Sequence, residues 1–293
     1  MSGILSLASG ILNLASTGFS FPLYSLNEQS VMTHSASNTL QVTREGDITT
    51  IRLNRPDRFN SFNQEMAFAF QHALDQCAED GTRCLVITGE GKAFSAGQDL
   101  NEVTDPNGPE LQNIVADHYN PIITRLRDLE LPIIAAVNGP AAGAGANIAL
   151  ACDIVIAKES AYFLQAFSHI GLIPDSGGTY HLPRIIGFQR ASALMMLGEK
   201  VGAKEAEAMG MIYKAIPETE WDEYVQKLSQ RLAAMPTRGL ALTKRALNLS
   251  LSNLLHEQLE VEEQLQTTAG KTSDYHEGVA AFLEKRKANF TGK

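Results

Sequence analysis

Asp175 is the one carboxylate in a glycine-rich and otherwise apolar segment, residues 171–178. A carboxylate in such a turn acts either as the cap of the following helix or as an acid or base in a reaction. Two more glycine-bearing turns, residues 94–99 and 138–147, each follow an apolar run typical of a strand. Each turn could direct a backbone N–H toward a common point. Two such donors beside one buried carboxylate would form a site that moves a proton next to a carbonyl group.

The composition indicates a globular protein with one main domain and a small additional part. A chain of 293 residues with 44% hydrophobic content can bury a large core. The formal charge of −9 argues against a broad nucleic-acid surface, because phosphate binding depends on clustered lysines and arginines. We therefore expect no nucleic-acid partner, and an anionic ligand would need a local basic patch.

The three cysteines, Cys77, Cys84 and Cys152, lie in apolar helix or strand contexts without the spacing of a zinc site. Neither a disulfide framework nor a bound metal is indicated. We interpret them as reduced, buried thiols of a cytoplasmic protein.

The first 31 residues differ from the rest, since they carry no charge before Glu28. A signal peptide would need a basic segment before its apolar stretch, and a membrane span would need about 20 uninterrupted apolar residues. Neither is present, so we expect no membrane association. We predict that residues 1–38 are a disordered extension, or that the natural start is Met32.

The pattern of apolar residues predicts an α/β fold with a mainly parallel sheet. Strands are predicted at residues 48–53, 84–88, 133–137 and 153–157. A short helix is predicted at 144–151. A longer helix should follow the possible cap Asn63, with a buried face formed by Met66, Phe70, Ala73, Leu74 and Cys77.

Beyond Pro183 the chain is predicted to be mostly helical, with helices at residues 191–197, 203–209, 221–234, 238–255 and 275–287. The last helix has Val279, Phe282 and Leu283 on one side. We expect these helices to pack onto the sheet or onto a neighbouring subunit. The predicted division is a core at 39–235 and a helical region at 236–293.

From about residue 40 to the C-terminus, these segments in this order resemble the crotonase superfamily of enoyl-CoA hydratases and isomerases. The resemblance implies a crotonase-like ββα spiral core with a C-terminal helical region. It also implies an acyl-CoA substrate, no cofactor apart from the coenzyme A of that substrate, and a homotrimer or hexamer. The segments that carry it are residues 53–56, 94–100, 135–139, 151–154, 171–174 and 277–286.

The resemblance also assigns catalytic roles. Gln98 follows Gly97 in the first turn and Ala144 follows Gly143 in the second, and their positions match the two N–H donors that bind the thioester oxygen. Ala144 should open a helix, whose free N–H groups favour negative charge. Asp175 matches the position where isomerases and a dehalogenase of the superfamily carry a catalytic aspartate. Burial beside an oxyanion should raise its pKa above the usual value.

Coenzyme A is a polyanion, so its site should contain basic residues. By the resemblance, Arg58 lies where a cation often approaches the phosphates, and the carbonyl of Ala96 matches the contact to adenine. Lys285 and its basic neighbours could contribute from the last helix, across a subunit boundary. The alternative interpretation is that these basic residues bind no ligand and only form a solvent-exposed helix face.

Two positions depart from the hydratases of the superfamily, which hold water between two glutamates. Asn147 and Phe167 stand there instead and are expected to line the substrate pocket. A single carboxylate can shuttle one proton between two positions of a substrate, so isomerisation is favoured over hydration. Residues 165–167, 174–179 and 274–282 resemble the isomerases that convert the ring epoxide of phenylacetyl-CoA to its oxepin form.

Several alternatives remain open at this point. Asp175 could only cap a helix, Asn147 could only satisfy nearby backbone, and His169 and His181 could only pack. The protein could be another enoyl-CoA or dienoyl-CoA isomerase, a hydratase, or a dehalogenase with Asp175 as nucleophile. It could also be a non-catalytic acyl-CoA binder or partner-assembly subunit, and RNA binding is disfavoured by the charge.

Overall fold

The computed structural model describes residues 38–293. The prediction of a disordered extension concerns residues 1–38, and all of it except Asn38, including the possible start at Met32, lies outside the described part of the chain. Among residues 38–293, no helix is both long enough and apolar enough to cross a membrane.

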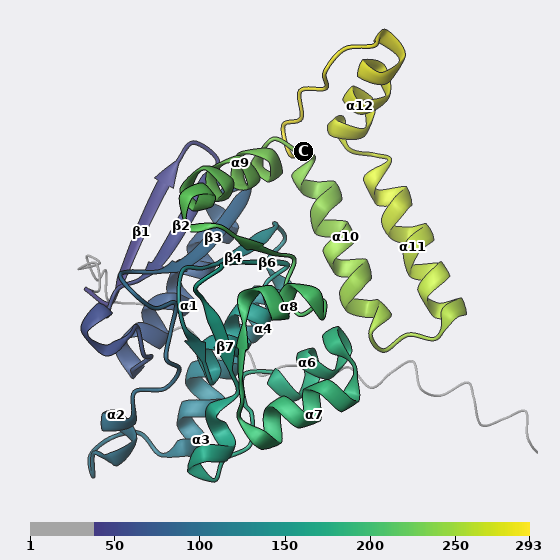
Figure 1. Cartoon of the computed structure of the whole chain (residues 1–293). Helices are drawn as coiled ribbons and strands as arrows, with labels where there is room; N and C mark the ends of the chain where they lie inside the picture. The colour runs from purple at the N-terminus through teal and green to yellow at the C-terminus, as the bar shows by residue number, and fades with distance from the viewer. Residues whose placement is uncertain (1–37) are drawn as a thin grey trace, which may run out of the picture. The chain divides into compact units, whose positions relative to one another are not determined.

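A six-stranded sheet forms the main layer, with strand order β1-β2-β3-β4-β6-β9 (Figure 1). The pair β1–β2 is antiparallel and all other pairs are parallel, which confirms the predicted sheet type. Every residue of β3 and β4 is buried, as expected for strands covered on both faces. The strands are β1 Leu40–Glu45, β2 Ile48–Leu53, β3 Cys84–Gly89, β4 Ile133–Val137, β6 Ile154–Lys158 and β9 Lys214–Ile216.

A second sheet of three short strands was not predicted. Its order is β5 (Ala141–Ala142), β7 (Tyr162–Leu164) and β8 (Lys200–Gly202). Isolated bridges extend its pairing toward the first turn, joining Ser95 to Ala141 and Phe62 to Gln98. The small sheet therefore places the first and second turns side by side.

Helix α1 (Gln64–Glu79) begins where the sequence predicts, because the Asn63 side chain accepts a hydrogen bond from the Met66 N–H at 3.0 Å. The whole predicted face of α1 is buried. The other helices of the core are α2 Leu100–Thr104, α3 Leu111–Asn113, a π-helix Ile114–Tyr119, α4 Asn120–Asp128, α5 Ala144–Leu150, α6 Gly178–Ile186, α7 Phe188–Leu197, α8 Ala203–Ala208 and α9 Trp221–Ala233, with 3₁₀ turns at Pro56–Arg58, Ala166–Ile170 and Glu218–Glu220.

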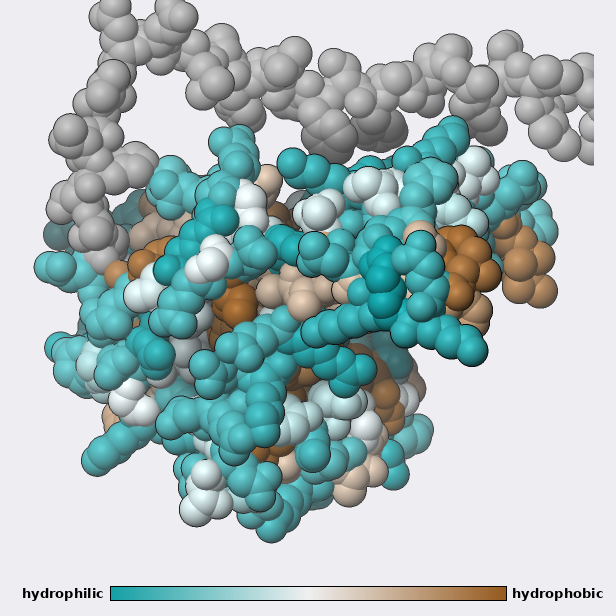
Figure 2. Space-filling view, turned by 90° about the horizontal axis from the view of Figure 1, so that it is seen from above, coloured by the Kyte–Doolittle hydropathy of each residue, from teal (hydrophilic) through white to brown (hydrophobic). Residues whose placement is uncertain are grey.

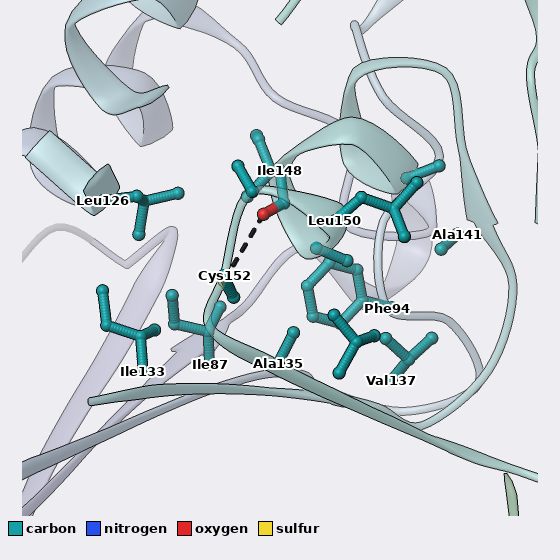
Figure 3. Close-up of a cluster of buried hydrophobic side chains, with 14 of the residues drawn as sticks. Ile87, Phe94, Leu126, Ile133, Ala135, Val137, Ala141, Ile148, Leu150 and Cys152 are labelled. Atoms are coloured by element: carbon teal, nitrogen blue, oxygen red, sulfur yellow. Dashed lines mark hydrogen bonds between the residues drawn. The ribbon is translucent and has the colours of Figure 1, made fainter. Parts of the chain in front are cut away.

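Helix α5 packs its apolar side against the large sheet (Figure 3). Ile148 of α5 and Ile87 of β3 are both fully buried in this cluster. Cys152, just after α5, donates from its thiol to the Ile148 carbonyl at 3.4 Å. All three cysteines are free and buried, as predicted, and burial raises the pKa of Cys77 to about 11 and of Cys84 and Cys152 to about 12. These thiols stay protonated and belong to the core.

The C-terminal region differs from the prediction at several boundaries. It contains α10 (Thr237–Ser250), α11 (Leu255–Ala269) and α12 (Ser273–Glu284). The predicted helix at 238–255 therefore ends earlier, α11 was missed, and α12 ends before the basic run. Helix α10 is attached to the core by the buried Lys244, whose ammonium lies 3.0 Å from the Asp153 carboxylate.

The last helix does not bury its apolar side on the sheet, so of the two expected packing partners only a neighbouring subunit remains, as a prediction. Val279, Phe282 and Leu283 are 43%, 83% and 74% exposed. Figure 2 shows hydrophobic side chains at the surface on the side where Figure 1 places the C-terminal helices. The C-terminal helices therefore carry an apolar face that the described chain does not cover.

Candidate active site

The two glycine turns touch each other at Gly97. A Cβ atom on this residue would lie 2.9 Å from the Ala142 carbonyl oxygen and 3.2 Å from the Ala144 nitrogen. Gly97 also has a φ of +86°, which side chains rarely adopt. Only glycine therefore lets the first turn approach the start of α5 so closely.

Both proposed oxyanion donors are free. Within residues 38–293, neither the Gln98 N–H nor the Ala144 N–H donates a hydrogen bond. Ala144 is the first residue of α5, whose opening N–H groups have no helical acceptor. The N–H group just before Ala144 is occupied, since Gly143 donates to the Leu164 carbonyl at 2.9 Å. The two free donors belong to the two turns that meet at Gly97.

Asp175 does not cap α6. That helix begins at Gly178 after Gly177, and no side chain caps its first N–H groups. Instead, the Asp175 carboxylate accepts a hydrogen bond from the Ser176 hydroxyl at 2.8 Å. The structure therefore rejects the capping interpretation and leaves the carboxylate available for chemistry.

Burial raises the pKa of Asp175 above its ordinary value, and the Ser176 hydrogen bond only partly opposes this effect. Within the described chain the carboxylate forms no ion pair. The nearby His181 cannot supply a positive charge at neutral pH, because burial lowers its pKa to about 4. Asp175 thus has the environment of a proton carrier rather than of a permanently charged residue.

The predicted pocket residues border both the turns and Asp175. Phe167 is 6% exposed, and its ring lies 3.8 Å from the position that a Cβ of Gly143 would occupy. Asn147 lies one turn into α5, and its side-chain amide donates to the Asp175 main-chain carbonyl at 2.9 Å. The Asn147 contact connects the Asp175 main chain to the helix that supplies the Ala144 donor.

The structure also shows three residues at the site that the sequence analysis missed. Tyr119 ends the π-helix and donates from its hydroxyl to the Gln98 side chain at 2.8 Å, while the Gln98 amide donates to Glu102 at 2.8 Å. Burial raises the pKa of Tyr119 well above its ordinary value, and the charges of Asp175 and Glu102 add to the shift. Gln165 donates to Asn147 at 2.8 Å.

The proposed coenzyme A residues are only partly brought together. Ala96 is exposed on the first turn, and its N–H donates to the Phe59 carbonyl at 2.9 Å. Arg58, the neighbour of Phe59, is exposed next to this turn. Lys285 follows α12, which lies apart from α1 and α2 in Figure 1. Within one chain, Lys285 does not join Arg58.

Comparison with known proteins agrees with this arrangement. Residues 43–293 match the family model described as enoyl-CoA hydratase/isomerase. The chain belongs to this family. It is 49% identical over 253 residues to the 1,2-epoxyphenylacetyl-CoA isomerase of Escherichia coli (strain K12), covering 85% of this chain and 97% of that protein. It is 35% identical over 255 residues to the 2,3-dehydroadipyl-CoA hydratase of the same strain, covering 87% and 99%.

The solved structures of the enoyl-CoA hydratase/isomerase family show the same fold. The crystal structure of an enoyl-CoA hydratase from Bacillus anthracis is 32% identical, with a TM-score of 0.81, and the match covers 87% of this chain and all of that chain. The predicted crotonase fold with a C-terminal helical region is therefore confirmed. The family relationship makes this chain an enzyme of the group that acts on CoA thioesters.

The raised pKa of Asp175 predicts an effect of this carboxylate on stability. At neutral pH the charged form is disfavoured in the folded state, so Asp175→Asn should raise the melting temperature by about 1 to 3 °C. The gain should fall as the pH drops through the Asp175 pKa and vanish below about 3.8, the ordinary value. Calorimetry at several pH values measures this difference.

The matched control for this experiment is Asp222→Asn, which changes an aspartate in the first turn of α9. A carboxylate there is favoured by the helix dipole, so its loss should not raise the melting temperature. If Asp175→Asn were less stable than the wild type at neutral pH, this result would contradict the claim that burial disfavours the charged Asp175 carboxylate in the folded state.

Proposed function

We propose that this protein is an acyl-CoA isomerase that uses one carboxylate and two main-chain donors. The observation that supports this most is the pairing of Asp175, unpaired and partly buried, with two free N–H groups on touching turns. The Asn147 side chain links α5, which supplies the Ala144 N–H, to the turn that carries Asp175. This geometry fits proton transfer next to a carbonyl whose oxygen gains negative charge.

In the proposed mechanism, the thioester oxygen accepts hydrogen bonds from the N–H groups of Gln98 and Ala144. The Asp175 carboxylate removes a proton from the carbon next to the carbonyl, and the electron pair moves onto the bound oxygen. The neutral Asp175 then returns the proton to another carbon as the electrons move back. Every atom of the substrate is retained, so the reaction is an isomerisation.

Hydration is less well supported because, among the described residues, no second carboxylate at the site is free to handle water. The positions that correspond to the hydratase glutamates are the amide Asn147 and the apolar Phe167. Glu102 is nearby, but its carboxylate accepts hydrogen bonds from Gln98 and from the Gln64 N–H. Asp175 is therefore the carboxylate we assign to the reaction.

The proposed substrate is ring-1,2-epoxyphenylacetyl-CoA, which would be converted to its oxepin form in aerobic phenylacetate breakdown. For this substrate the carbon–carbon bond shared by the six-membered ring and the epoxide also breaks, its electrons enter the double bonds of the seven-membered ring, and no atom is gained or lost. The similarity to the Escherichia coli isomerase supports this choice, and Phe167 at the pocket wall suits an aromatic ring. A fatty-acid type enoyl-CoA or dienoyl-CoA isomerase is the second candidate, since the same proton transfer would serve an aliphatic chain.

A panel of acyl-CoA thioesters tests the proposal directly. Purified protein is mixed with the aromatic epoxide, aliphatic enoyl and dienoyl, and chlorobenzoyl thioesters, and products are followed by absorbance and mass. An isomeric product of unchanged mass from the epoxide supports the proposal. A gain of water indicates a hydratase, loss of chloride indicates a dehalogenase, and binding without turnover indicates an acyl-CoA binder.

The variant Asp175→Asn should abolish isomerisation while coenzyme A affinity changes by no more than a few-fold. The amide keeps the size of the side chain but cannot accept a proton at neutral pH. Turnover and the affinity for a non-reactive thioester are measured on the same preparation. Turnover that persists in this variant would remove Asp175 from the mechanism.

The variant Ala144→Pro tests the main-chain donor, which no side-chain change removes. Proline is tolerated at the first position of a helix but lacks the N–H. We expect kcat to fall by about 100- to 1,000-fold, the usual effect of losing one oxyanion donor. The control is Ser273→Pro, which places proline at the exposed first residue of α12, outside the site and outside the exposed apolar residues of the proposed assembly. Equal losses in both variants would argue against a specific donor.

We further propose that the protein assembles as a trimer or a dimer of trimers through its C-terminal helices. Their exposed apolar residues are numerous for the surface of an isolated chain. One group lies around the connection between α10 and α11, and a second group lies on α12; the residues are Leu247, Leu251, Leu254, Leu255 and Leu259 in the first and Val279, Phe282 and Leu283 in the second.

Light scattering should give a mass of three or six times 31.8 kDa. The double change of Phe282 and Leu283 to aspartate should lower the mass, because charges would be buried in the interface. Val42→Asp serves as the control, since Val42 is an exposed apolar residue of β1. A monomeric wild-type protein would contradict the assembly.

A further inference from the structure

The turn that carries Asp175 is strained. Ser176 and Gly177 both have positive φ values, 50° and 70°, and the Gly178 N–H donates to the Asp175 carbonyl at 2.8 Å, which closes the turn. Positive φ is natural for glycine, but for a buried serine it costs free energy. Such a conformation persists only where surrounding contacts hold it.

Asn147 provides a contact from outside the turn. Its side-chain amide donates to the same Asp175 carbonyl, at 2.9 Å, and the residue is 1% exposed. The fit is tight, because a Cβ on Gly178 would lie 2.4 Å from the Asn147 amide nitrogen. The amide therefore lies between α5 and the turn, where it fixes one relative to the other.

Gln165 in turn orients Asn147. Its amide donates to the Asn147 side-chain oxygen at 2.8 Å, which fixes the amide so that its nitrogen faces Asp175. Gln165 is 2% exposed, yet its own side-chain oxygen accepts no hydrogen bond within the described residues. Leaving a buried acceptor unpaired costs free energy, so an apolar residue would be expected at this position if packing alone mattered.

We propose that Asn147, oriented by Gln165, is a positioning residue that holds the strained turn and thereby aims the Asp175 carboxylate at the substrate. The inference rests on the proposed function, in which Asp175 carries the proton. It assigns to Asn147 an action on the Asp175 main chain rather than direct contact with the acyl group. The pair of neutral amides aligns the carboxylate without adding a charge beside it.

Asn147→Asp is the most informative variant. When ionised, the new side chain cannot donate to the Asp175 carbonyl, and kcat should fall by about 10- to 100-fold because the carboxylate is misplaced. When protonated, it can donate again while still accepting from Gln165. The ratio of variant to wild-type kcat should therefore rise as the pH is lowered from about 8.5 to 5.5, with KM within about threefold throughout.

Other charged and titratable groups around α5 act equally in variant and wild type, so the ratio removes their effect. They are Tyr119 on the π-helix, Glu102 on α2, His181 and Arg184 on α6, and Arg127 on α4. Asp175 is not among them, because its own titration is expected to change with Asn147 and is measured separately. Asn147→Ala should lose a similar factor in kcat at every pH, because alanine cannot regain a donor.

Asn248→Asp is the matched control. Asn248 also donates its amide to a main-chain carbonyl, that of Arg127 at 3.0 Å, and its oxygen accepts from the Arg127 side chain. Its loss should leave kcat unchanged. If Asn147→Asp fails to fold, Gln165→Met provides a second test. Methionine keeps the size of the Gln165 side chain and removes only the amide that orients Asn147. It should lower kcat by about 3- to 10-fold.

A measurement without substrate separates this inference from the proposed function. Isotope-edited infrared titration, with Asp175→Asn to assign the band, reads the Asp175 carboxyl directly. In Asn147→Ala its pKa should move toward the ordinary value, because the released turn exposes the carboxylate, whereas Asn248→Ala should leave it unchanged. An inactive wild type with this infrared shift would refute the isomerase and keep the positioning role.

Two results would overturn the inference. One is an Asn147→Asp enzyme whose kcat ratio does not change with pH. The other is an Asp175 titration that is the same in wild type and in Asn147→Ala.

Discussion

The close contact between the two glycine turns is the constraint on which the site depends. A side chain at Gly97 would collide with the main chain at the start of α5, and a Cβ at Gly145 would lie 2.6 Å from the Ser95 oxygen. Two free N–H groups from distant parts of the sequence can be directed to one oxygen only if the main chains themselves touch. The small sheet maintains this contact, since the bridge between Ser95 and Ala141 aligns the turns.

The sequence predicts most of the fold where a local pattern decides the structure. The cap at Asn63, the buried face of α1 and the fully apolar strands β3 and β4 depend on neighbours within a few residues. The small sheet could not be predicted, because strands of two or three residues have no periodicity. Helix α11 was missed because most of its residues are polar and none is buried, so its few apolar residues, among them Leu255 and Leu259, do not form a clear periodic pattern. The exposed face of α12 is a different case, since its apolar pattern is present but its partner is not within the described chain.

The sequence predicts those residues of the candidate site that lie in recognisable motifs. Gln98, Ala144 and Asp175 lie in turns with recognisable glycines, and the structure brings these turns together. Tyr119 and Gln165 could not be found in the same way. Each acts through one hydrogen bond to a residue far away in the sequence, and no local pattern records that pairing.

In the proposed mechanism, catalysis and folding stability make opposite demands on the Asp175 carboxylate. A carboxylate that must accept and return a proton benefits from a raised pKa, which requires partial burial and no cationic partner. Burial of this kind destabilises the folded state when the group is charged. The surrounding groups are accordingly neutral: Asn147 and Gln165 are amides, and His181 has lost its charge. A lysine or arginine at any of these positions would stabilise the charged carboxylate and lower its pKa, so that it would return the proton less readily. The neutral amides thus fix the direction of Asp175 while its proton affinity is set by burial and by the opposing Ser176 hydrogen bond.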